Sequence, residues 1–224
     1  MSALAATFRR DFALMWGAGG GALAPVGFFL GAATLAPLAM GPEHALLVSA
    51  GPPLVWIAAA LAVLATLERL FQADLESGAL DLLLASPAPF ELLILIKALA
   101  HWLAIGLPLT ALAVVGGLML GLALDSALML ALTLLIGTPG LSLTGAIAGA
   151  LTAGVRRGSL LLTLLVLPLY APFVIFGAGA ATIAANPAPP ETPFPALLLL
   201  GACSMVAALS AVLLMPSAVK SQLD

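Results

Sequence analysis

The sequence contains very little charge for its length. Of its 224 residues, only 8% are Asp, Glu, Lys or Arg, whereas 63% are hydrophobic, and the mean hydropathy is +1.23. A soluble domain is normally about a quarter charged, and so apolar a chain could not cover its surface with polar groups. We therefore expect an integral membrane protein. The net charge of −3 and the lack of a basic patch indicate that nucleic acid is not a partner.

Cysteine and catalytic motifs are also scarce. Cys203 is the single cysteine in the sequence, which excludes a disulfide framework and a paired-cysteine metal site. The sequence has no GxxxxGK[ST] loop for ATP phosphates, and neither GxSxG nor HExxH occurs. The long apolar runs carry no acidic or basic residue deep inside them, which disfavours an ion-coupled carrier. We predict no catalytic, cofactor-binding or metal-binding residues.

What the sequence does contain is six long apolar runs. A transmembrane helix needs about 20 apolar residues, and each run is long enough for one such helix. The runs are too long and too rich in Gly and Pro for the strands of a membrane barrel. The first run is also too long for the core of a cleaved signal peptide, so we expect none. We predict a single all-α membrane domain over 1–224, with spans at about 19–41, 45–67, 98–124, 127–153, 159–185 and 194–217.

The basic residues predict the orientation of these spans. In a six-helix arrangement every Lys and Arg falls on the side of the two termini, and the opposite loops contain only acidic charges, at Glu43, Asp125 and Glu191. Basic loops remain in the cytoplasm. We therefore expect both termini to be cytoplasmic, together with Arg9, Arg10, Arg69, Lys97, Arg156, Arg157 and Lys220.

Charge is concentrated between the second and third predicted spans, in a segment that begins LERLFQADLESGALDLLLASP. Seven charged residues there would cost on the order of 20 kcal/mol inside a bilayer, so we expect a cytoplasmic segment over 68–97. Leu67, Leu70, Phe71 and Leu75 recur at helical spacing, and Gly78 can end or bend that helix. The helix could lie on the membrane surface or dock onto a partner protein. Its acidic balance favours the partner.

The N-terminal segment LAATFRRDFALMW shows a second amphipathic pattern. Leu4, Phe8, Phe12 and Trp16 lie four residues apart, and Arg9 falls off that face. We predict an amphipathic interfacial helix over 1–16; a simple extension of the first span is the alternative.

The two histidines are His44 and His101. A span of about one bilayer thickness separates their predicted positions, so they cannot bind one iron together. We expect His44 to be a solvated loop residue, with a single axial haem ligand as the alternative. We expect His101 to lie at the inner surface, hydrogen-bonded to a loop carboxylate. Within the spans, Pro108, Pro139 and Pro168 favour kinks.

Several segments, read in order, carry a family resemblance: LERLFQADLESGALDLLL, KALAHW, GLPL, ALTLLIGTP and RRGSLLLTLLVLPLYAPFVIF. Over about residues 8–176 the chain resembles CcmB, the permease subunit of the ABC complex for cytochrome c maturation. The resemblance implies an ABC-2-type exporter permease in a bacterial inner membrane. It also implies an ABC ATPase subunit that binds the ATP, two copies of each subunit, a haem-handling membrane subunit, a small accessory membrane subunit and a periplasmic haem chaperone.

In such permeases the cytoplasmic loop between the second and third spans holds a coupling helix that contacts the ATPase. The resemblance thus implies a coupling segment over 68–97 and a partner-binding set of Glu68, Arg69, Phe71, Asp74, Leu75, Glu76, Gly78 and Asp81. The chain itself would bind no cofactor, and haem would be handled by the complex. Two other functions stay open: the permease of another ABC-2 exporter, for lipid, polysaccharide or drug, and a standalone membrane enzyme.

Overall fold

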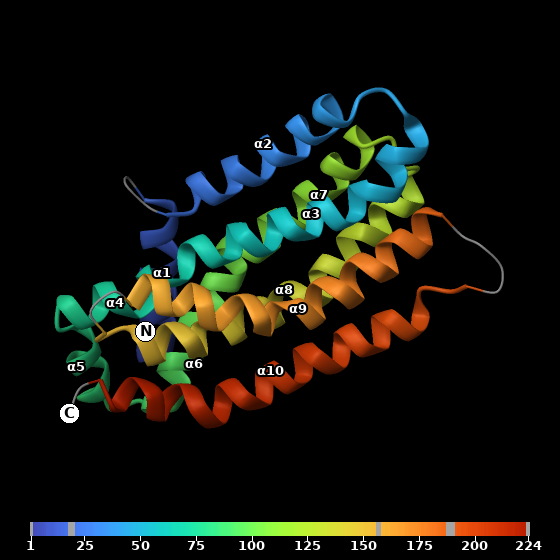
Figure 1. Cartoon of the computed structure of the whole chain (residues 1–224). Helices are drawn as coiled ribbons and strands as arrows, with labels where there is room; N and C mark the ends of the chain where they lie inside the picture. The colour runs from blue at the N-terminus through green and yellow to red at the C-terminus, as the bar shows by residue number, and fades with distance from the viewer. Residues whose placement is uncertain (1, 18–20, 156–157, 187–190, 223–224) are drawn as a thin grey trace.

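A computed structural model describes residues 2–17, 21–155, 158–186 and 191–222. These residues form a bundle of helices without strands (Figure 1). Within them, six stretches are long and apolar enough to cross a membrane, which confirms the predicted all-α, six-span architecture. The stretches are Leu23–Met40, His44–Glu76, Phe90–Met119, Leu124–Thr152, Gly158–Ala185 and Phe194–Lys220.

The bundle is built around α8 (Leu124–Thr152), which packs along α7 (Leu107–Met119), α9 (Gly158–Ala185) and α10 (Phe194–Lys220). The helix α3 (His44–Leu67) lies against α2 (Leu23–Met40) and α9. Figure 1 shows that one end of the bundle carries α1 (Ala3–Trp16), α4 (Arg69–Glu76), α5 (Ala79–Leu84) and both ends of the chain. We call this the α4–α5 end.

Small residues allow the central helices to approach closely. The indole of Trp56 on α3 is fully buried, and its Nε1 donates a hydrogen bond to Thr133 Oγ1 at 3.0 Å. A Cβ atom added to Gly137 or Gly177 would come within 2.4 Å or 2.1 Å of that ring. Glycine at these two positions therefore makes the space in which α3, α8 and α9 pack around Trp56.

The helix that leads into the third predicted span begins before that span. This helix, α6 (Phe90–His101), starts directly after Pro89, whereas the sequence predicted a start of the span at 98. The predicted span began after Lys97 because that residue was counted among seven isolated charges, and the point at which α6 enters the membrane stays a prediction. In the structure Lys97 is buried and neutralised by two carboxylates, so a helix can include it.

The same span changes its helical pitch in the middle. A π-helical turn, η1 (Trp102–Gly106), follows α6, and α7 begins with Pro108 in its first turn. Proline has no N–H to donate and its ring collides with the preceding turn. A widened π turn accommodates such a collision, and turns of this kind occur frequently at functional sites.

The N-terminal helix α1 packs against α6 through a polar face. Thr7 and Asp11 are its buried residues, whereas Phe12 and Trp16 are exposed. Ser2 caps its first turn by accepting a hydrogen bond from the Ala5 N–H. An apolar outer face and a polar inner face suit a helix at a lipid surface, and the interfacial placement stays a prediction.

Candidate functional site

The candidate site lies at the α4–α5 end. Helix α4 continues α3 almost without a break, because the connecting residue Glu68 keeps a helical backbone (φ −55°, ψ −42°). Helix α4 ends before Gly78, whose φ of +71° is a left-handed conformation that favours glycine. The chain then reverses into α5. The sequence therefore identified correctly the residue that ends the first charged helix.

The predicted partner-binding residues divide into exposed and buried groups. Phe71 and Asp74 are buried, with 1% and 6% of their surface exposed. Phe71 packs in a hydrophobic cluster with Phe90 of α6 and Met215 of α10. These two side chains face the bundle, so they are not available to a docked protein in this structure. The remaining predicted residues are half-buried (Leu75 and Gly78) or exposed (Glu68, Arg69, Glu76 and Asp81).

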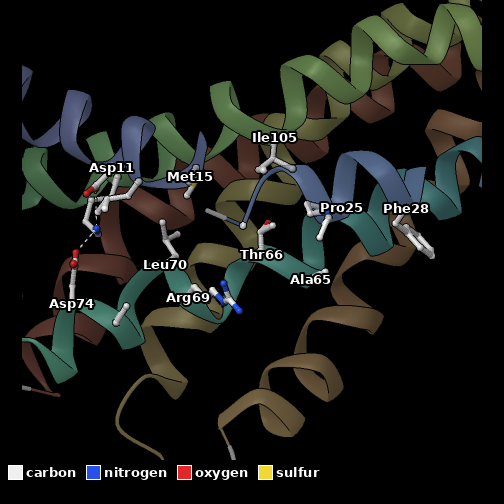
Figure 2. A pocket seen from close by; sticks show the side chains of 15 residues that line it. Asp11, Met15, Pro25, Phe28, Ala65, Thr66, Arg69, Leu70, Asp74 and Ile105 are labelled. Carbon is white, nitrogen blue, oxygen red and sulfur yellow. Dashed lines mark hydrogen bonds and ion pairs between the residues drawn. The ribbon is translucent and has the colours of Figure 1, made fainter. Parts of the chain in front are cut away.

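Asp74 belongs to a charged cluster of four residues: Arg10, Asp11, Asp74 and Lys97. The Lys97 ammonium donates to Asp11 Oδ2 at 2.8 Å and to Asp74 Oδ2 at 2.5 Å. The Arg10 guanidinium also binds Asp74, and its Nη1 lies 3.6 Å from Asp11 Oδ1. The cluster therefore joins α1, α4 and α6, as Figure 2 shows for the two carboxylates.

The cluster balances its own charge. Lys97 is only 2% exposed and Asp11 only 4%, but two cations face two carboxylates. Partial burial lowers the pKa of the Arg10 guanidinium, but its hydrogen bond to Asp74 and the charges of Asp74 and Asp11 outweigh this effect and leave the pKa raised. The sequence offered one signal for this cluster, a lysine inside an apolar helical run.

A second polar network crosses the interior, and it overturns the expectation for His101. That side chain is fully buried instead of lying at the surface. Its Nε2 is within 2.7 Å of Thr66 Oγ1 on α3, and its Nδ1 is within 3.2 Å of Ser142 Oγ on α8. The expected carboxylate partner was wrong because two hydroxyls from neighbouring helices satisfy both ring nitrogens. His44, in contrast, is exposed at the start of α3, as expected.

A groove opens beside the charged cluster, between α1, the first turns of α2, the α3–α4 junction and η1. We call it the α1–α2 groove; its volume is about 560 Å³. Figure 2 shows Asp11 and Asp74 near one end of it and Pro25 and Phe28 near the other. Arg69 lies on the wall between them.

Comparison with known proteins decides the family. The family model described as "CcmB protein" matches residues 2–222. The chain belongs to the CcmB family. The match reaches further than the resemblance over 8–176, because it also includes α10.

Curated CcmB-family relatives are similar over most of their length. A protein named "Heme exporter protein B" from Bradyrhizobium diazoefficiens is 48% identical over 92% of this chain and 93% of its own. Its namesake from Paracoccus denitrificans is 47% identical over 88% of each chain. The one from Pseudomonas aeruginosa is 52% identical over 70% of each chain.

The site in this CcmB-family chain is a junction of packed helices held together by buried ion pairs. Across the described ranges, no three His, Cys, Asp or Glu side chains come together as a metal site. The buried carboxylates Asp11 and Asp74 are held by cations and are not positioned as free bases. What the site provides is a rigid junction of three helices next to an exposed, acidic tip.

Proposed function

We propose that this chain is the membrane permease subunit of the ABC transporter complex for c-type cytochrome maturation. It would sit in the bacterial inner membrane with both termini cytoplasmic. The family match along 2–222, with relatives named "Heme exporter protein B", carries the proposal. This match favours the cytochrome function over the permease of another ABC-2 exporter and over a standalone enzyme.

In this function the chain hydrolyses no ATP itself. A separate ABC ATPase subunit binds and hydrolyses ATP, and the permease converts that event into haem delivery or into release of the haem-loaded periplasmic chaperone. The haem-handling membrane subunit and the small accessory subunit complete the assembly, with two permease copies per complex. The lack of an ATP-phosphate loop in the sequence supports this division of labour.

The ATPase would dock on the tip of α4 and α5. Glu76 and Asp81 present negative charge there, and Leu82 exposes 74% of its surface beside them. A single exposed leucine is normal on a protein surface, so the two acidic side chains carry the docking proposal. Gly78 sets the angle between the two helices. Glu68 and Arg69 lie earlier in the chain, at the junction of α3 and α4, and would contribute at the edge.

Phe71 and Asp74 would transmit motion instead of touching the ATPase. Asp74 is tied to Lys97 of α6 and to Arg10 of α1. Because α4 also continues α3, a push on α4 acts on three other helices at once. Packed interiors transmit such displacements because they deform little.

The sharpest test is the charge reversal Glu76→Lys. Its side chain is exposed and accepts one hydrogen bond from Gln72 Nε2 at 2.9 Å, so its loss costs folding only about 0.2–0.5 kcal/mol. We expect the variant to insert at the wild-type level, to lose co-purification of the ATPase subunit, and to lower the c-type cytochromes on haem-stained gels.

The matched control is Glu191→Lys, an exposed acidic residue in the loop before α10. It makes the same charge change far from the tip, and both readouts should stay normal. Normal ATPase co-purification and normal cytochrome levels in Glu76→Lys would refute docking at this tip.

A further inference from the structure

The α1–α2 groove is polar at one end and apolar at the other. Asp11 and Asp74 lie toward the α4–α5 end, Pro25 and Phe28 lie toward the middle of the bundle, and Arg69 lies between the two pairs (Figure 2). From Asp74 to Ala65 the α4–α3 wall rises about 14 Å. That is close to half of the roughly 30 Å hydrocarbon layer. With its polar end at the headgroups, the groove would therefore reach about as deep as the hydrocarbon of one leaflet.

The charge of the groove comes from Arg69. The charged cluster neutralises itself, because Lys97 is shared between Asp11 and Asp74, and Arg10 also holds Asp74. The Arg69 side chain is exposed, and among the residues that the structure describes it forms no ion pair. A guanidinium offers the geometry that recognises a phosphate. The groove therefore presents one available cation next to its apolar part, the slot lined by Pro25, Phe28 and Ala65.

The flanking surface also suits lipid. Phe28 on α2 is half exposed and Leu14 on α1 is more than half exposed, so the apolar wall continues onto the outer face of the bundle. An opening that continues onto an apolar outer face suits a ligand with an acyl chain better than a fully polar one.

We propose that the α1–α2 groove binds one anionic phospholipid of the leaflet on the α4–α5 side. Its phosphate lies at Arg69, and one acyl chain lies between Phe28 of α2 and Ala65 of α3. Because α1 and α4 both line the groove, the bound lipid touches two of the three helices that the charged cluster joins. The site is defined by this chain alone and does not depend on an ATPase subunit.

The test uses the full chain in phosphatidylcholine nanodiscs that contain a photoactivatable phosphatidylglycerol, with the reactive group on its acyl chain. Peptide mapping after illumination should find cross-links on the peptides that contain Phe28 and Ala65. An otherwise identical phosphatidylcholine probe should label them about fivefold less, the weight of one basic side chain at an anionic lipid surface.

Two variants separate charge from shape. Arg69→Gln removes the cation and should lower phosphatidylglycerol labelling about fivefold. Ala65→Phe fills the slot and should lower labelling by both probes. The control Ala202→Phe adds the same bulk to an exposed position on α10, outside the groove, and should change nothing.

Three outcomes would overturn the site: equal labelling by the two probes, unchanged labelling in Arg69→Gln, or unchanged labelling in Ala65→Phe. The measurement contains no ATPase and no ATP, so its failure would leave the docking proposal standing. In the same way, normal ATPase co-purification in Glu76→Lys would leave the lipid site standing.

Discussion

Replacing Lys97 with methionine removes the ammonium that two buried carboxylates share and leaves an unbranched apolar side chain that is one atom shorter. Asp74 would still be held by Arg10, but Asp11 would retain only the Arg10 nitrogen at 3.6 Å. Breaking a buried ion pair from one side typically costs 3–5 kcal/mol. Because one of the two carboxylates retains a close partner, we expect a loss of about 3 kcal/mol, near the lower end of that range.

The chain provides its own control for this prediction. Lys220 binds Glu91 at 2.9 Å, close to the 2.8 Å of the Lys97–Asp11 pair, but about half of each side chain is exposed. An exposed pair contributes about 0–1 kcal/mol. Lys220→Met should therefore change the free energy of unfolding very little, although it too breaks an ion pair of nearly the same length between a lysine and a carboxylate.

The assay is unfolding of purified protein in mixed micelles, titrated with a denaturing detergent and followed by tryptophan fluorescence. Lys97→Met should unfold at a clearly lower detergent fraction than Lys220→Met. Adding Asp11→Asn to Lys97→Met removes the stranded charge and should recover part of the loss. Equal stability of Lys97→Met and Lys220→Met would refute the view that burial gives the cluster its strength.

Two further predictions concern the interior and use the same unfolding assay. Gly177→Ala places a Cβ atom 2.1 Å from the buried Trp56 ring and should lower the free energy of unfolding by about 1–3 kcal/mol through overpacking. The control Gly201→Ala meets open space and should be neutral or stabilising. Equal effects of the two variants would refute the tight packing around Trp56. His101→Leu leaves the buried Ser142 hydroxyl without its histidine partner and should lower the free energy of unfolding by about 1–3 kcal/mol. Recovery of stability in His101→Gln would show that the loss comes from hydrogen bonding and not from the shape of the side chain.

The number of spans could be predicted because hydropathy sums over many residues. Six apolar runs predicted six spans, and six stretches among the described residues are long and apolar enough to be those spans. The last helix begins at Phe194, where its run indicated. Gly78 was predictable for a related reason. A helix end that needs a positive φ selects glycine, so this one residue carries its own structural signal.

The charged cluster could not be predicted in this way. Its key contact joins Lys97 to Asp11, which lie 86 residues apart in the sequence. A hydropathy sum counts each charge as an isolated cost, whereas a pair that is buried together cancels much of it. The same reasoning explains the error over His101. Its partners Thr66 and Ser142 are hydroxyls on two other helices, and nothing local in the sequence distinguishes them from other Ser and Thr residues.

The difference between Asp74 and Glu76 decides how charge reversals at this site should be interpreted. The two residues are neighbours on α4, but Asp74 is buried and bound to Lys97 and Arg10, whereas Glu76 is exposed. Asp74→Lys would put a third cation beside two others in a buried site, a cost of several kcal/mol. The protein would be lost whether or not an ATPase docks nearby. Loss of c-type cytochromes in Asp74→Lys is therefore no evidence for docking, and the interpretable reversal is the one at Glu76.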